Sequence, residues 1–351
     1  MKHNYVILMA GGIGSRFWPM SRKEFPKQFH DVLGTGRTLI QQTADRFKNI
    51  CSSDQMYILT NNEYAGLVKE QLPEIPEQNI LLEPVMRNTA PCIAYATYKI
   101  GMNDPEANMI VSPADHLVLD VQEFERDINL AIERTSTSDK LVTLGIKPHR
   151  PDTGYGYIKF DDQQEGKVRT VAKFTEKPPL EEAEAFLNAG NYFWNSGIFI
   201  WSYHNIDQAI SSYLPEMKKL FKSGEEFYNT PKEQSFIDTH FPNCESISID
   251  YGIMEKSSKV EMIMTDFGWS DLGTWGSLYE HLDQDANANA VTGKKVILFN
   301  SENNMIRNET DKTLMIRGMN DYIIVETEKA LLICPKTEEQ SVKQMLNSLD
   351  K

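Results

Sequence analysis

The first half of the chain alternates short apolar runs with helical patterns, and this alternation restricts the possible folds more than any other feature. The apolar runs lie at residues 5–10, 56–60, 80–82, 109–112 and 141–146. Between them, Phe124, Ile128 and Ala131 have the spacing of one face of an amphipathic helix. Strands that alternate with helices predict a mainly parallel sheet with helices on both faces. Ligands of such α/β sheets bind at the carboxyl ends of the strands.

The pattern changes from about residue 150. Further strands are expected at 154–158, 168–175, 192–201 and 259–265, and helical stretches recur between 203 and 240. We therefore expect a larger domain over residues 1–283 and a small β-rich domain over residues 284–351. The last element should be a helix that begins at Thr337, because Thr337 and Gln340 fit a capping box. One face of this helix should carry the apolar residues Val342, Met345, Leu346 and Leu349.

A glycine loop rich in cations follows the first expected strand. Its glycines are Gly11, Gly12 and Gly14, and its cations are Arg16, Arg22, Lys23 and Lys27. Backbone N–H groups of such a loop approach an anion closely, because glycine has no Cβ in the way. The cations favour a ligand with several negative charges, most simply a nucleoside triphosphate. The alternative is an ordinary turn between a strand and a helix.

The loop matches neither of the two common phosphate-binding motifs. No G-x-x-x-x-G-K-[ST] run occurs in the chain. A dinucleotide fingerprint that begins at Gly12 would need its third glycine where Phe17 stands. The sequence therefore argues against a P-loop enzyme and against a Rossmann oxidoreductase.

Composition excludes several classes of protein. The chain has 351 residues and a net charge of −14, which disfavours nucleic acid as a partner, because phosphate backbones need a broad basic face. No apolar stretch is long enough to cross a membrane. Four widely separated cysteines form no C-x-x-C pair, so they are expected to be free thiols in a reducing cytoplasm: they are Cys51, Cys92, Cys244 and Cys334.

Two aspartates are candidates for a magnesium site. Asp115 follows an expected strand in the segment SPADH, and Asp271 lies in the segment WSDLGTW. Mg²⁺ takes one or two carboxylates and completes its shell with water and substrate phosphates. Either aspartate could instead cap a helix. The neighbouring His116 could be a general base. It is interpreted as structural instead, because a phosphate that acts as nucleophile is already ionised at neutral pH and needs no base.

The motifs, taken in their order along the chain, resemble those of the nucleotide-sugar pyrophosphorylases, and most closely the mannose-1-phosphate guanylyltransferases. The resemblance spans most of residues 5–280. It rests on the segments LMAGGIGSRFWPMSR, FPKQF, EPVMRNTAPCIAYA, SPADH, GYGYI, FTEKP, WNSGIFIW, SIDYGIMEKS and WSDLGTW. The EPxxRNTAP and PKQF elements distinguish this group from relatives that use other nucleoside triphosphates.

The resemblance implies a role for each matching residue. The triphosphate would lie on Gly11, Gly12, Gly14, Ser15 and Arg16. Charge on the transferring phosphate would be stabilised by Arg16 and Lys27, and Mg²⁺ would be held by Asp115 and Asp271. Guanine would be read by Glu83, Asn88 and Thr89. Mannose 1-phosphate would contact Gly145, Glu176, Lys177 and Asn195.

The resemblance also implies the reaction. GTP and α-D-mannose 1-phosphate would give GDP-mannose and pyrophosphate by in-line attack, in a cytoplasmic homodimer that binds neither membrane nor nucleic acid. The fold would be a Rossmann-like nucleotidyltransferase domain with a mixed, mainly parallel sheet, followed by a small β-helix-like domain. Two alternatives stay open: a guanylyltransferase for a heptose or fucose phosphate, and a non-catalytic regulatory homologue that binds sugar nucleotides. No phosphomannose isomerase activity is expected, because no histidine cluster with metal-ligand spacing follows.

Overall fold

The computed structural model describes residues 2–161 and 165–349, and the chain divides into two compact units. The first unit comprises Met1–Gly11, Ala44–Ala114 and Val118–Trp269, and the second comprises Gly12–Thr43, Asp115–Leu117 and Ser270–Lys351. Most of the glycine loop therefore packs with the C-terminal residues. The expected boundary at residue 283 separates two continuous stretches of chain, whereas each compact unit combines three separate stretches. The expected boundary stays a prediction.

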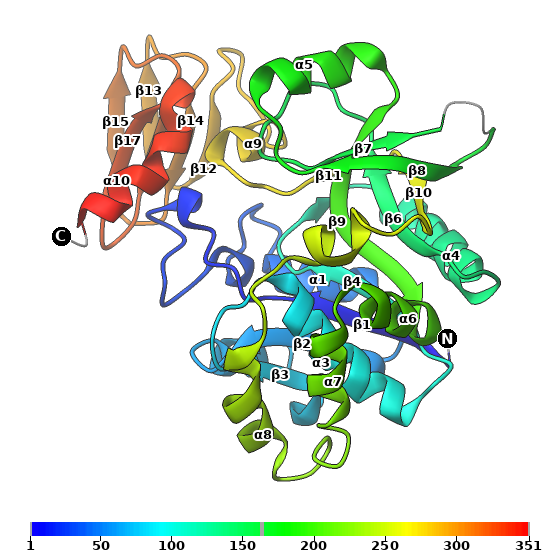
Figure 1. Ribbon diagram of the computed structural model, residues 1–351. Helices are drawn as coiled ribbons and strands as arrows, with labels where there is room; N and C mark the ends of the chain where they lie inside the picture. The colour runs from blue at the N-terminus through cyan, green and yellow to red at the C-terminus, as the bar shows by residue number, and fades with distance from the viewer. Residues whose placement is uncertain (1, 162–164, 350–351) are drawn as a thin grey trace. The chain divides into compact units, whose positions relative to one another are not determined.

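The first unit is built on a nine-stranded sheet in the order β3-β2-β1-β4-β9-β6-β10-β8-β7 (Figure 1). Its strands are β1 (Asn4–Met9), β2 (Met56–Asn61), β3 (Ile80–Glu83), β4 (Asn108–Pro113), β6 (Leu141–Ile146), β7 (Tyr157–Phe160), β8 (Val168–Thr175), β9 (Tyr192–Ser202) and β10 (Val260–Thr265). β3, β2, β1 and β4 are parallel, and so are β6 and β10. β9 runs antiparallel to both β4 and β6, and β8 runs antiparallel to both β7 and β10, so the sheet is mixed.

Helices and buried side chains cover both faces of this sheet. Ile7 of β1 belongs to the large apolar core that α3, α6 and α7 help to build. Its neighbours Val6 and Leu8 point to the opposite face and are equally buried. The helices of the first unit are α2 (Ala65–Gln71), α3 (Thr89–Asn103), α4 (Val121–Ser136), α5 (Leu180–Ala189), α6 (Tyr203–Tyr213), α7 (Pro215–Lys222) and α8 (Glu233–His240).

Three short elements span the boundaries between the units: α1 (Leu39–Arg46), β5 (Leu117–Val118) and β11 (Trp269–Ser270). The second unit itself contains α9 (Trp275–Tyr279) and six strands. These strands are β12 (Ala290–Gly293), β13 (Val296–Phe299), β14 (Met305–Asn308), β15 (Leu314–Arg317), β16 (Tyr322–Glu326) and β17 (Leu331–Pro335).

The strands of the second unit stack in the manner of a β-helix. β12, β14 and β16 pair in parallel, and β13 pairs in parallel with β15. Asn289 and Asn304 continue the stack with a side-chain ladder: the Asn304 amide donates to Asn289 Oδ1 over 2.9 Å, and Asn304 Oδ1 accepts the backbone N–H of Tyr322. The expected β-rich C-terminal region is confirmed.

The C-terminal helix begins later in the chain than expected. A 3-10 segment covers Lys336–Ser341, and the helix α10 begins only at Val342 and ends at Leu349. No side chain caps the 3-10 segment, whose N-cap is Pro335, so the capping box at Thr337 is wrong. Proline fixes φ and turns the chain without a side-chain cap. Val342 is buried, whereas Met345 is 50% exposed, and the Leu349 side chain lies outside the described residues.

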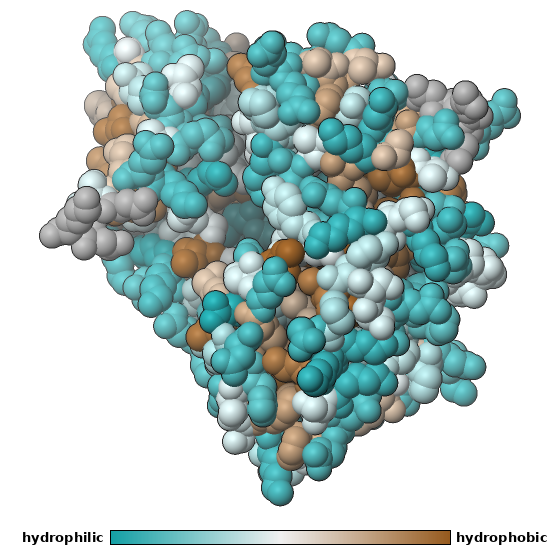
Figure 2. All heavy atoms as spheres, viewed as in Figure 1, coloured by the Kyte–Doolittle hydropathy of each residue, from teal (hydrophilic) through white to brown (hydrophobic). Residues whose placement is uncertain are grey.

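The surface seen in Figure 2 is mostly hydrophilic, with hydrophobic residues in small scattered groups. Among the described residues, no helix is both long and apolar enough to cross a membrane. All four cysteines are free and buried, in agreement with the expectation of unpaired thiols.

Candidate active site

The glycine loop turns sharply at Gly14, where only glycine fits. Gly14 has a φ of +68°, a conformation that L residues with a Cβ rarely adopt. A Cβ at this position would lie 2.6 Å from Cβ of Lys27. The loop then continues into a 3-10 turn at Ser15–Phe17. Gly14 therefore brings the backbone of the loop directly against Lys27.

The loop presents its N–H groups and uses its carbonyls for support. The Gln28 amide donates to the Gly12 carbonyl over 3.0 Å, and the Ser21 hydroxyl donates to the Ile13 carbonyl. In the described part of the chain, the backbone N–H groups of residues 12–16 have no hydrogen-bond partner. A row of unpartnered N–H groups suits an anion, and the phosphate cradle stays a prediction.

Lys27 is buried and saturated with acceptors. Only 3% of the residue is exposed. Its ammonium lies 2.7 Å from Asp115 Oδ2 and donates to the carbonyls of Asp271 and Leu272 over 2.9 and 3.0 Å. An ammonium has three N–H donors, and here each has an acceptor. A phosphate oxygen could bind this ammonium only by replacing one of the three acceptors. In this arrangement the main contribution of Lys27 is therefore to join the segments that carry Asp115 and Asp271.

Asp115 is held as a carboxylate by its neighbours. Burial, the largest single effect, raises its pKa, but the charges of Lys27 and His116 and the hydrogen bonds to the carboxylate together outweigh burial and leave the pKa below the ordinary value of 3.8. His116 Nε2 lies 3.9 Å from Asp115 Oδ1 and adds to the same effect. An ionised carboxylate is the form that a divalent cation binds.

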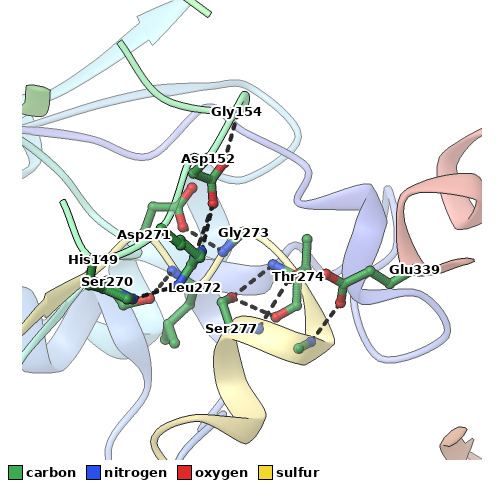
Figure 3. A network of polar contacts seen from close by, with 12 residues as sticks. His149, Asp152, Gly154, Ser270, Asp271, Leu272, Gly273, Thr274, Ser277 and Glu339 are labelled. Carbon is green, nitrogen blue, oxygen red and sulfur yellow. Dashed lines mark hydrogen bonds and ion pairs between the residues drawn. The ribbon is translucent and has the colours of Figure 1, made fainter. Parts of the chain in front are cut away.

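Asp271 lies in a tight turn before α9, and Figure 3 shows the polar contacts of this turn. Asp271 Oδ1 accepts the Gly273 N–H over 2.9 Å. Thr274 and Ser277 then cap α9 through reciprocal hydrogen bonds of 3.1 Å. The Glu339 carboxylate accepts the Gly276 N–H over 2.7 Å. The turn that carries Asp271 is therefore fixed by a capped helix and by a residue of the C-terminal segment.

A cavity of about 230 Å³ brings the predicted phosphate and metal residues together. Every residue that lines it belongs to the second unit. These residues are Gly14, Ser15, Arg16, Phe17, Lys27, Asp115, His116, Asp271, Gly273 and Lys343. Arg16, Lys27 and the two aspartates are far apart in sequence, so their convergence is a result of the tertiary structure.

The donor set of the cavity fits Mg²⁺. Asp115 and Asp271 supply two carboxylates on one cavity. Among the described residues, no group of three or more His, Cys, Asp or Glu side chains is arranged to hold a metal. Mg²⁺ commonly takes one or two carboxylates and completes its octahedron with water and phosphate oxygens, so two carboxylates beside a phosphate cradle suffice.

The predicted guanine-reading residues cluster in the first unit around the start of α3. Burial raises the pKa of Glu83 to about 8, and the side chain lies near Gly11, because a Cβ there would be 3.9 Å from Glu83 Oε1. The Asn88 amide donates to the Ser246 hydroxyl over 3.1 Å. Thr89 Oγ1 accepts the Ile249 N–H over 2.9 Å. Besides its predicted role at the base, the Thr89 hydroxyl therefore helps to hold the backbone at Ile249 in place.

Asn195 lies at an irregularity of β9. The register of β6 and β9 shifts between Thr143 and Gly145. Thr143 donates to Asn195 Oδ1 over 3.1 Å, and the Asn195 amide donates to Asp250 Oδ1 over 2.8 Å. Gly145 pairs with Asn195, but a Cβ on Gly145 would lie 2.1 Å from Sδ of Met262, so packing alone requires this glycine.

Glu176 and Lys177 follow β8 as an ion pair, with 2.6 Å between Lys177 Nζ and Glu176 Oε1. Lys177 has a φ of +47°, so its backbone is held in the left-handed region. Burial, followed by the negative charge of Glu176, raises the pKa of Asp250 to about 6. Glu176, Lys177, Asn195 and Asp250 therefore form one electrostatic group in the first unit.

Two residues of these groups were not found by sequence reasoning. Asp250 lies within the motif SIDYGIMEKS, and its conspicuous signal is an acid inside an otherwise apolar stretch. Lys343 lies outside every matching motif, in a helix that looked only amphipathic. Its place at the cavity depends on packing of the C-terminal segment, which no local pattern reports.

Comparison with known proteins identifies the family of this chain. Residues 5–288 match the model of the nucleotidyl transferase family. This chain belongs to that family. Residues 294–349 match a second model, described as the MannoseP isomerase/GMP-like beta-helix domain. The expected fold, a nucleotidyltransferase domain followed by a β-helix-like domain, is confirmed.

Individual relatives of this nucleotidyl transferase cover nearly the whole chain. A mannose-1-phosphate guanylyltransferase of Escherichia coli is 36% identical over 355 residues, which are 98% of this chain and 75% of the relative. The alginate biosynthesis protein AlgA of Pseudomonas putida is 36% identical over 98% of this chain and 71% of its own length. A solved structure from Thermus thermophilus, described as a mannose-1-phosphate geranyltransferase, has a TM-score of 0.88 and 26% identity over 99% of this chain and 100% of its own. The expected membership of the mannose-1-phosphate guanylyltransferase group is confirmed.

Proposed function

We propose that this nucleotidyl transferase transfers GMP from GTP to α-D-mannose 1-phosphate and releases pyrophosphate. The observation that carries the proposal is the cavity in which the glycine loop, three cations and two aspartates converge. Such a cavity fits the triphosphate of a nucleotide. The names of the relatives supply the two substrates.

Phosphoryl transfer of this kind needs positioning and charge stabilisation more than covalent chemistry. The N–H groups of the glycine loop would bind the triphosphate oxygens together with Ser15. Arg16 is exposed at the cavity and would reach the phosphate charge directly. Lys27 would hold Asp115 ionised and keep the Asp271 turn in place.

Asp115 and Asp271 would hold Mg²⁺ against the phosphates. The ion would supply charge neutralisation for the leaving pyrophosphate. The protein's own part is to keep both carboxylates ionised and directed into one cavity, which the low pKa of Asp115 favours.

The first unit would recognise the base and the sugar phosphate. Guanine presents N1–H and N2–H donors side by side, which adenine lacks and which one carboxylate can accept together. We therefore assign its recognition to Glu83, with Asn88 and Thr89 beside it. Burial raises the pKa of Glu83 to about 8, so the binding of guanine would have to shift this group to its ionised form. The sugar phosphate would contact Lys177 through its phosphate and Asn195 and Glu176 through its hydroxyls, near Gly145. Asp250 would hold Asn195 in the required orientation.

Three further proposals concern the protein as a whole. We propose a homodimer, which light scattering on the purified protein would test. Its place would be the cytoplasm, which suits four buried free thiols. Nucleic acid is not expected to bind, given the net charge of −14.

Turnover tests the proposal and both alternatives together. Purified protein with Mg²⁺ and GTP is given mannose, fucose and heptose 1-phosphates, and the release of pyrophosphate is followed. We expect mannose 1-phosphate to be preferred, and GTP to exceed ATP by roughly 10⁴, because adenine leaves hydrogen-bonding groups unpaired. Preference for another sugar would establish the first alternative. No turnover, combined with binding of GDP-mannose, would establish the regulatory homologue.

A further inference from the structure

The cavity contains a cation that comes from the C-terminal helix. Lys343 is the second residue of α10 and lines the same cavity as Ser15, Arg16 and Asp271. α10 packs against the 3-10 turn at Ser15–Phe17 that follows the glycine loop. Both belong to the second unit, so this contact is internal to one compact body.

The position of Lys343 is fixed by its neighbours along the chain. Val342 is 1% exposed and belongs to the core that contains Phe17 and Trp275. Glu339 accepts the Gly276 N–H over 2.7 Å. The Lys336 ammonium lies 3.7 Å from the centroid of the Tyr279 ring and donates to Asn303 Oδ1 over 2.7 Å. The segment before Lys343 is therefore held at several points.

The charges of the cavity indicate what Lys343 is for. Apart from His116, the charged residues that line it are Arg16, Lys27, Asp115, Asp271 and Lys343. The first two cations are balanced by the two aspartates, so Lys343 supplies the surplus positive charge. Among the described residues, no ion pair or hydrogen bond occupies its side chain, whereas the Lys27 ammonium is saturated.

We propose that Lys343 is a phosphate-binding residue that contacts the β- and γ-phosphates of GTP and the pyrophosphate that leaves. The C-terminal β-helix-like region thereby completes the nucleotide site and does more than support it. An exposed ammonium on a flexible stem is a suitable point charge for a polyphosphate end. This inference rests on the proposed function, since it assigns one residue to the nucleotide half of that reaction.

The experiment compares the K343Q and K343R variants with wild type in both directions of the reaction. In K343Q we expect the KM for GTP and the KM for pyrophosphate to rise about tenfold, the size expected for one charge-assisted hydrogen bond. The KM for mannose 1-phosphate should stay within about twofold. K343R should restore most of the affinity. Lys329 is exposed on the same unit, so K329Q is the matched control and should behave as wild type.

A direct binding measurement separates this proposal from the proposed function. Inorganic pyrophosphate with Mg²⁺ is titrated calorimetrically into wild type and K343Q at low and high salt. We expect weaker binding and a shallower salt dependence in K343Q, because one screened charge contact is lost. Equal affinity and equal salt dependence in the two proteins would overturn the role of Lys343. A wild type that binds pyrophosphate but turns over no sugar phosphate would overturn the proposed function instead.

Discussion

The Lys27 ammonium lies 2.7 Å from the Asp115 carboxylate. The two residues are far apart in sequence, and the same ammonium holds the carbonyls of Asp271 and Leu272. One buried cation thus joins the glycine-loop segment to both aspartate segments of the cavity. This relationship determines how the site is expected to respond to mutation and to pH.

Replacing Lys27 by methionine should destabilise the protein by about 3 kcal/mol, because the carboxylate of Asp115 is left partly buried without its partner. Asp115 has a lowered pKa in the folded state, so the pair stabilises the protein above the ordinary pKa of 3.8 and loses this effect as the pH falls through the folded pKa.

Urea unfolding of wild type and K27M between pH 3 and pH 7 measures this difference. The free-energy gap between the two proteins should be full at neutral pH and shrink at the acid end. K329M, which removes an exposed charge from the same unit, is the control and should cost under about 0.5 kcal/mol. A gap that stays constant with pH would contradict the ion pair.

Asp271→Asn should lower turnover by roughly 10²–10³, the cost of one charge-stabilising group in the transition state. The amide keeps the size of the carboxylate and an oxygen that can accept the Gly273 N–H, so the melting temperature should change little. Pyrophosphate release at saturating Mg²⁺ is the measurement. Asp283→Asn, at an exposed position, should retain wild-type turnover, and an equally active D271N enzyme would remove Asp271 from the site.

Gly14→Ala should destabilise the protein by about 1–3 kcal/mol and reduce affinity for GTP. The cause is twofold: the φ of +68° disfavours alanine, and the new Cβ would lie 2.6 Å from Cβ of Lys27. Gly66, which lies in α2 with open space around it, offers the contrasting control. G66A should be neutral or stabilise by up to about 1 kcal/mol. Thermal unfolding of both variants makes the comparison.

Glu83 should make stability and base recognition depend on pH. Burial raises its pKa from 4.5 to about 8 in the folded chain, so the folded state keeps a proton that the unfolded state releases. Stability from this group is full below pH 4.5 and is lost as the pH rises to about 8. Relative to Glu83→Gln, wild type should therefore lose up to about 1.4 kcal/mol per pH unit across this window.

Denaturation of wild type and E83Q from pH 5 to pH 9 tests the stability effect. For the base, E83Q should lower the preference for GTP over ATP by about tenfold or more, because the guanine N–H groups lose a carboxylate that their binding would hold ionised at neutral pH. Parallel pH profiles for the two proteins would contradict the raised pKa. An unchanged preference for GTP would move guanine recognition to other residues.

The sequence by itself determined the class of the fold and the chemistry of the loop. Apolar runs predicted the strands of the nine-stranded sheet, because burial on a sheet selects such runs locally. The two-residue strand β5 was not predicted. Gly14 and the cations after it predicted an anion site, because a glycine turn and the charges beside it lie within a short stretch of sequence. The predicted helix start at Thr337 was wrong: a 3-10 segment follows Pro335 over Lys336–Ser341, and α10 begins only at Val342.

Only the tertiary structure decided which residues share a site. Lys27, Asp115, Asp271 and Lys343 converge on one cavity although they are separated by long stretches of sequence. The compact unit that contains them combines the glycine loop with the C-terminal strands. Convergence of this kind depends on long-range packing and on ion pairs whose strength is set by burial. A sequence specifies both, but no local pattern within it displays them.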